Sequence, residues 1–265
     1  MKKKVKNKFD TLVENLIVEF SKIPNFDLTQ TDETANQVFN IISFRMAEVI
    51  SYKDLVCQSF IPATNKAIFD AKKDFQNSRY KIYLNTKELD FKETLYETVR
   101  LGYVGLFHKL ENYINDVIKV SDLIFSSVYE TEESVAKWAK DKFQFDIRNW
   151  KQFYITEKIN WISNCVKHKD SFPIKEPKPI IFRHLKESEK IKISPDTFKQ
   201  DCDFLIKFYP IYLQMMFIFA QHKIIFEKPL IKEEWEHTPD LYDKQVETRN
   251  KMECLVQDFV KMLKE

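Results

Sequence analysis

The residues best suited to chemistry in this chain form a polar stripe along one predicted helix. Residues three and four positions apart share a face of an α-helix. Five polar residues follow this spacing: Glu157, Asn160, Asn164, Lys167 and His168. The opposite face is apolar and would meet the core, with Ile155, Ile159, Ile162 and Val166. Because Pro173 disfavours helical geometry just before it, His168 is expected near the helix C-terminus, and a solvated face ending in a surface histidine is the simplest interpretation.

Histidine, lysine and asparagine together can support cleavage of RNA without a metal. A histidine transfers a proton to or from the ribose 2′-hydroxyl or the leaving oxygen. A cation stabilises the charge that develops on the phosphate. In this stripe His168 would be the general acid or base, Asn164 would orient it, and Lys167 would bind the phosphate.

Composition argues against most other chemistries. The 265 residues include only two glycines, so phosphate-binding glycine loops, dinucleotide fingerprints and nucleophile elbows cannot be built. The five histidines show neither HxH nor HExxH spacing, and the four cysteines form no CxxC pair. Cys165 lies three residues before His168, but the helical spacing turns it toward the core, where a buried thiol is expected. We therefore expect neither a metal nor a cofactor.

The overall composition is that of a soluble globular chain, with 44% hydrophobic and 31% charged residues. The net charge of +2 does not indicate a nucleic-acid-binding protein, although a local basic patch remains open. The basic N-terminus lacks the apolar stretch of a signal peptide, and the most apolar segment, 208–220, is too short to cross a bilayer. Four cysteines without a secretion signal fit a reducing compartment. A cytoplasmic protein without a membrane span is expected.

Apolar periodicity predicts an all-α bundle of seven or eight helices with one small β-hairpin. Helices are expected over 6–21, 33–60, 63–80, about thirty residues from Asp90, 132–143, 145–168, 196–226 and 239–263. Short apolar runs at 179–183 and 190–193 flank a polar turn and predict the hairpin, while 80–84 is a strand or an extended connection. The whole chain, 1–265, is expected to form one domain. Its core would span about 90–226, with the helices of 1–80 and the helix 239–264 packed on it.

The two glycines, Gly102 and Gly105, fall inside the longest predicted helix. A glycine in a helix interior costs about 1 kcal/mol relative to alanine, so both positions need a compensating reason. Close approach of another helix would provide it. That helix would belong either to the same chain or to a second subunit.

The motif helix and the order of elements around it resemble the HEPN superfamily, helical proteins of bacterial defence, toxin and RNA-processing systems. The hallmark of that family is an R-N-x-x-x-H motif at a helix end. Asn164 and His168 match the Asn and His of the motif. The motif arginine is missing, because positions 161–163 are Trp161, Ile162 and Ser163. The resemblance covers about 90–226 and would make this a HEPN-like core.

The resemblance implies a metal-independent ribonuclease or defence effector, commonly a dimer whose site forms across two subunits. His168 would be the general acid or base, and Arg100 and Glu111 on the long helix would form the opposite wall. Lys167, or Arg100 or Arg148 from elsewhere in the chain, would replace the missing arginine. A lysine lacks the planar fork of an arginine, so this replacement would not be neutral.

Two further hypotheses remain open. The missing arginine favours a non-catalytic helical binding or regulatory subunit of a bacterial defence or toxin–antitoxin system. Alternatively, the basic residues around the loop after the motif would contact RNA phosphates: Lys167, Lys169, Lys175 and Lys178. The expected partners are therefore RNA, a second copy of the chain, or a protein of a defence system.

Overall fold

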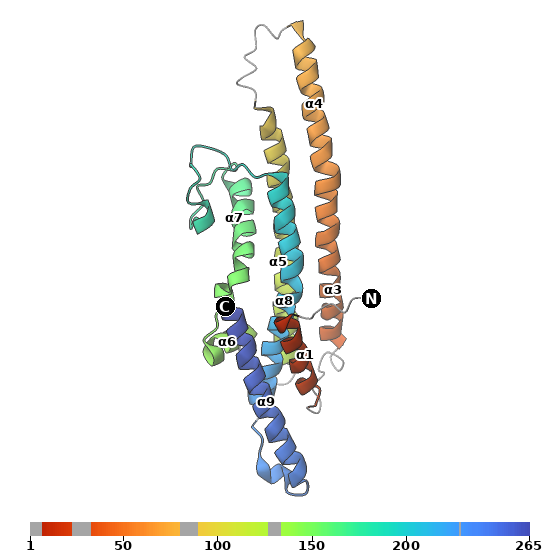
Figure 1. The fold of residues 1–265 in the computed structure, drawn as a ribbon, viewed down its shortest axis with the longest axis vertical. Helices are drawn as coiled ribbons and strands as arrows, with labels where there is room; N and C mark the ends of the chain where they lie inside the picture. Colours follow the sequence, from red (N-terminus) through yellow and green to blue (C-terminus); the bar gives the residue numbers. More distant parts are fainter. Residues whose placement is uncertain (1–6, 23–32, 80–89, 127–133, 228) are drawn as a thin grey trace. The chain divides into compact units, whose positions relative to one another are not determined.

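The computed structural model describes residues 7–22, 33–79, 90–126, 134–227 and 229–265. These residues form helices and non-regular connections without a β-strand (Figure 1), which confirms the all-α class. The α-helices are α1 Lys8–Phe20, α3 Glu33–Asp54, α4 Ile61–Asn77, α5 Phe91–Ser126, α6 Val135–Phe143, α7 Tyr154–His168, α8 Pro195–Glu227 and α9 Pro239–Lys264. The predictions at 80–84 and for the start of the helix at 132 lie outside the described residues.

The chain divides into two compact units built from interleaved segments. Unit 1 comprises Met1–Ser43, Ile114–Phe153 and Pro210–Glu265. Unit 2 comprises Phe44–Tyr113 and Tyr154–Tyr209. Helices α3, α5 and α8 each contribute residues to both units. This division cuts across the core at 90–226 that the sequence predicts.

In unit 2, a π-helix joins α3 to α4 without a break. The π-helix spans Leu55–Phe60, and its wider turn is closed by the Ile61 N–H, which donates to the Val56 carbonyl. Pro62 follows at the start of α4. In the first turn of a separate helix a proline loses no hydrogen bond, because the N–H groups there have no partner within the helix. Here the helix continues from the preceding segment, and in a continuous α-helix the proline ring collides with the carbonyl four residues earlier. The π-turn immediately before Pro62 widens the helix at that point and accommodates the ring.

Gly102 and Gly105 lie where other helices of the same chain approach α5 closely. A Cβ at Gly102 would lie 3.1 Å from the Phe198 ring, and a Cβ at Gly105 would lie 2.1 Å from the Tyr52 hydroxyl oxygen. That hydroxyl donates a 3.1 Å hydrogen bond to the Gly102 carbonyl. The predicted close approach is therefore confirmed, and an internal contact explains it without a second subunit.

We expect Gly105→Ala to destabilise the protein because the added methyl group displaces the Tyr52 ring. The loss of the hydrogen bond and of ring packing outweighs the gain in helix propensity of about 1 kcal/mol. In a Tyr52→Ala background the obstruction is gone, so the same substitution should stabilise. Urea unfolding of the four proteins in a double-mutant cycle measures this change of sign. An equal cost of Gly105→Ala in both backgrounds would contradict the close contact.

In unit 1, helix α1 packs along α9. The ring of Phe9 lies 5.6 Å from that of Phe259, and the buried Glu19 accepts hydrogen bonds from Lys22 and Lys251. The apolar stripe of α9 has six residues. Met252, Val256, Phe259, Val260 and Leu263 are buried, and Leu255 is half-buried. The α9 helix begins at Pro239 as predicted.

Unit 1 also contains a pair between the buried His222 of α8 and the half-buried Glu253 of α9. The His222 Nε2 atom lies 2.6 Å from Glu253 Oε2, and the His222 ring stacks on Phe226 at 4.2 Å. Burial lowers the pKa of His222 below its ordinary value of 6.5, although the hydrogen bond to Glu253 opposes this shift. The same hydrogen bond is the main reason that the pKa of Glu253 falls from 4.5 to about 2. A neutral His222 therefore donates to an ionised Glu253.

These shifts predict that acid destabilises the protein. Below pH 6.5 the unfolded chain protonates His222 whereas the folded chain does not, so the free energy of unfolding falls as the pH falls. Below pH 4.5 Glu253 adds to this loss, which continues to about pH 2. We expect His222→Phe, measured by urea unfolding from about pH 7 to 5, to remove part of this slope. Parallel profiles for the variant and the wild type would contradict a buried neutral histidine.

One stretch of the described residues, Pro195–Lys223 in α8, is long and apolar enough to cross a membrane by length and composition alone. Half of its most apolar window is buried inside the structure. The core helix of a soluble protein meets the same criteria, so this is weak evidence for a span.

The predicted β-hairpin is wrong. Ile180–Phe182 form a turn of 3-10 helix, and residues 190–193 have no regular structure. Phe182 stacks on Trp161, with ring centroids 4.6 Å apart, and the Ile191 N–H donates to the Ser171 carbonyl. Contacts with α7 and with the loop that follows it therefore replace the strand pairing that β-branched residues favour.

Candidate functional site

Helix α7 carries the polar stripe and ends where the sequence predicts. It begins later than expected, because two turns of 3-10 helix, Ile147–Asn149 and Lys151–Phe153, precede it. At its C-terminus the Cys165 carbonyl accepts the N–H groups of Lys169 and Ser171. Ser171 has a φ of 69°, which turns the chain out of the helix. These contacts leave His168 as the last residue of α7.

The predicted faces of α7 are confirmed. Glu157, Asn160, Lys167 and His168 are exposed, and Asn164 is half-buried. On the other face Ile155, Ile159 and Ile162 are buried as predicted, together with Cys165, whereas Val166 is half-buried. Burial raises the pKa of the Cys165 thiol, so this residue is the inert core cysteine that the spacing predicts.

The side chains of the expected nuclease centre have other contacts. The Asn164 amide donates a 2.5 Å hydrogen bond to the Asn160 side chain. The Lys167 ammonium lies over the Phe107 ring, 5.0 Å from its centroid. Within the described part of the chain, no side chain forms a hydrogen bond or ion pair with His168.

Arg100 and Glu111 do not join His168 either. Arg100 is buried, donates to Glu93 at 2.5 Å and donates to the Ile191 carbonyl at 3.0 Å. Glu111 is exposed on α5, and no described hydrogen bond or ion pair joins it to His168. Positions 161–163, where the motif arginine is missing, are buried. Arg100 therefore does not fill this gap in the described contacts, because its guanidinium bonds to Glu93 and to the Ile191 carbonyl.

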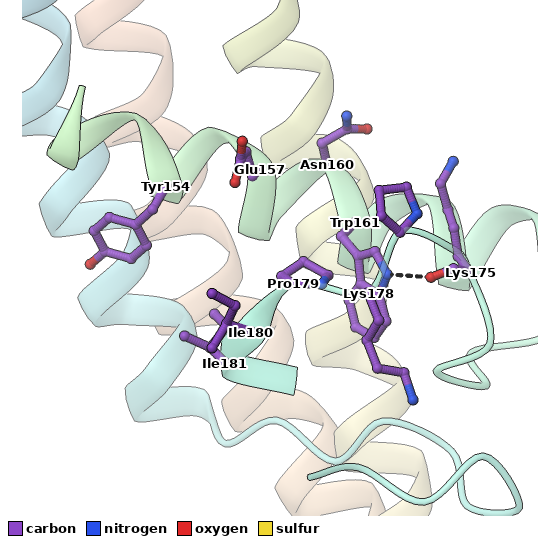
Figure 2. A pocket seen from close by; sticks show the side chains of 10 residues that line it. Tyr154, Glu157, Asn160, Trp161, Lys175, Lys178, Pro179, Ile180 and Ile181 are labelled. Atoms are coloured by element: carbon purple, nitrogen blue, oxygen red, sulfur yellow. Dashed lines mark hydrogen bonds between the residues drawn. The ribbon is translucent and has the colours of Figure 1, made fainter. Parts of the chain in front are cut away.

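The first half of the polar stripe lines a groove of about 550 Å³ within unit 2 (Figure 2). Tyr154, Glu157, Asn160 and Trp161 of α7 form one wall. The segment 175–181 forms the other, through Lys175, Pro177, Lys178, Pro179, Ile180 and Ile181. Sequence reasoning missed this groove, because it interpreted the apolar run of the second wall as a strand.

The second wall of the groove is held in place by specific contacts. The Trp161 indole N–H donates a 2.8 Å hydrogen bond to the Lys175 carbonyl, drawn as a dashed line in Figure 2. The Trp161 ring also stacks on Phe182, which anchors the end of the wall. Pro177 and Pro179 further restrict the backbone between these two anchors. The wall is therefore preorganised.

The groove exposes apolar side chains. Ile180 is 76% exposed, and Ile181 and Tyr154 are each 46% exposed. The neighbouring Phe182 is buried, so this short segment both anchors the wall and presents apolar surface. Apolar groups gathered in a concave surface are typical of binding sites rather than of ordinary solvent-facing loops.

In the described residues, no three His, Cys, Asp or Glu side chains gather around one point. Comparison with family models, curated proteins and solved structures gives no match to this chain. The fold and the site together therefore describe an all-α protein with a preorganised apolar groove beside the polar stripe of α7.

Proposed function

We propose that this chain is a non-catalytic helical binding or regulatory subunit, which holds a partner protein in the groove between α7 and residues 175–181. The exposure of Ile180 and Ile181 in a preorganised concave surface carries the proposal. A groove fixed before binding loses less conformational entropy when a partner enters it.

The contacts of the polar stripe support a binding role over catalysis. A nuclease of the expected kind needs a cation near the phosphate and a partner that orients the histidine. Lys167 instead lies over Phe107, and Asn164 donates to Asn160. Arg100 is buried in an ion pair with Glu93. The resemblance to the HEPN superfamily supports a bacterial defence or toxin–antitoxin setting, where such a subunit would regulate an effector.

A metal-independent ribonuclease is the second candidate function. It is favoured by the exposure of His168 at the end of α7, between the exposed cations Lys167 and Lys169. Rotation of the exposed side chains on RNA binding would be needed to assemble the centre.

Incubation of labelled RNA with the purified chain in excess EDTA separates the two functions. We expect no cleavage above background from the wild type, from His168→Ala or from His184→Ala. His184 is an exposed histidine of the same unit that lies outside the polar stripe and does not line the groove, so it serves as the matched control. Cleavage by the wild type and by His184→Ala, lost in a His168→Ala variant of equal stability, would overturn the binding proposal and establish the nuclease.

A further inference from the structure

We infer that the occupant of the groove is a short acidic segment of a partner protein, anchored by two apolar side chains. The inference rests on the proposed binding function and names the class of ligand. It follows from three features of the described residues: the apolar surface in the groove, the local excess of positive charge, and the burial of the Trp161 and Phe182 rings, which leaves one partly exposed ring, Tyr154, in the groove.

The apolar surface fixes the first property of the ligand. Ile180 and Ile181 are adjacent in sequence and both exposed, and the Tyr154 ring on the facing wall is half exposed. A volume of about 550 Å³ takes a few side chains of a peptide rather than a whole helix or domain surface. A ligand segment with two apolar residues therefore matches the groove in chemistry and size.

Charge fixes the second property. Residues 167–192 contain eight lysines and arginines and four acidic residues, whereas the whole chain has a net charge of only +2. The acidic residues already have local partners: Asp170 pairs with Lys190, Glu187 with Lys178 and Glu189 with Lys186, while Glu176 accepts the Lys178 N–H. This leaves an excess of positive charge in the segment that supplies the second wall of the groove.

Lys175 brings that excess into the groove itself. Its side chain lines the groove (Figure 2), and its ammonium group has no ion pair among the described residues. Glu157 on the α7 wall is the one acidic residue among the groove's lining residues. Carboxylates of a ligand are therefore expected beside Lys175, on the wall opposite Glu157.

The aromatic residues argue for a peptide rather than RNA. Proteins that bind single-stranded RNA stack bases on exposed rings. Here the Trp161 and Phe182 rings stack on each other and are buried. The Tyr154 ring is partly exposed and makes a T-shaped contact with Phe204, with ring centroids 5.5 Å apart. Tyr154 is therefore the one partly exposed ring among the groove's lining residues, and the other groups that the groove offers are apolar side chains and ammonium groups.

Selection from a phage-displayed library of random peptides of about twelve residues tests the inference on the full chain. The Ile180→Ser/Ile181→Ser variant serves for counter-selection, since both residues are exposed and neither belongs to the buried core. We expect enriched sequences that combine two apolar residues with neighbouring Asp or Glu. Failure to enrich peptides, or enrichment of basic ones, would overturn the inference.

A labelled peptide of the enriched sequence then measures affinity by fluorescence anisotropy. We expect a loss of about tenfold or more for Ile180→Ser/Ile181→Ser and of about tenfold for Lys175→Glu, with weaker binding in higher salt. Ile174→Ser is the matched control, because Ile174 is 43% exposed in the same segment but does not line the groove. Equal affinities for all variants would overturn the inference. It would also be overturned if single-stranded RNA displaced the labelled peptide and bound more weakly to the Ile180→Ser/Ile181→Ser variant than to the wild type.

Failure of this inference is distinguishable from failure of the proposed function. RNA cleavage that depends on His168 overturns the binding subunit whatever the peptide selection yields. Absence of both cleavage and peptide binding overturns the inference of an acidic peptide ligand, while the proposal of a non-catalytic subunit remains.

Discussion

Replacement of Asp201 by alanine is expected to lower the free energy of unfolding by about 3–5 kcal/mol. Asp201 is 7% exposed, accepts the Tyr103 hydroxyl and forms an ion pair with Lys158, with a hydrogen bond of 2.7 Å. The Lys158 side chain is only 14% exposed. Without the carboxylate, the fold would hold a poorly hydrated ammonium group and a buried hydroxyl with no acceptor. Both are costly in a low-dielectric interior.

Asp203 provides a matched control two residues away on the same helix. It also pairs with a lysine, Lys53, at 2.9 Å, but its side chain is 45% exposed. Exposed ion pairs contribute less than about 1 kcal/mol, so Asp203→Ala should cost little. Urea unfolding of both variants measures the difference. Similar costs for the two substitutions would show that burial does not set the value of the Asp201 contacts.

The second large effect is expected for Arg100→Ala, which should lower the free energy of unfolding by about 3 kcal/mol. The guanidinium of Arg100 ties Glu93 of its own helix to the Ile191 carbonyl in the loop before α8. Alanine removes both hydrogen bonds and leaves the space of a long buried side chain empty. Thermal unfolding and limited proteolysis of the 171–191 segment would detect the loss of stability and of loop anchoring.

The exposed Glu97, on the same helix, is the control for the Arg100 substitution. Glu97→Ala removes no buried contact and should change stability by less than about 0.5 kcal/mol. An Arg100→Ala variant as stable as wild type would contradict a structural role. That result would favour the role that the HEPN resemblance implies for Arg100, on the wall facing His168.

The helix faces were predictable from the sequence because they depend on local spacing. Four of the five stripe residues are exposed and three of the four residues on the apolar face are buried, since a 3.6-residue period sets both faces whatever packs against them. The same period places the buried residues of α9 on one face. Gly102 and Gly105 likewise predicted a close contact, because glycine in a helix interior is unfavourable without one.

Local spacing does not determine which partners the polar side chains choose. Asn164 and Asn160 share one face of α7, and they bond to each other rather than to His168. Arg100 lies in a predictable helix, yet its partner Ile191 is far away in sequence. Such contacts depend on where distant segments meet, which no window of the chain contains.

The sequence by itself determined an all-α protein whose polar helix ends in an exposed histidine, because helical periodicity and proline placement act over a few residues. Only the tertiary structure decided what the run from Pro179 to Arg183 becomes. β-Branched residues favour a strand on average, but here Phe182 stacks on Trp161 and draws the run into a 3-10 turn. Because of that long-range contact the run forms one wall of an apolar groove instead of a hairpin. The groove supports the proposal of binding beside the polar stripe over catalysis at His168.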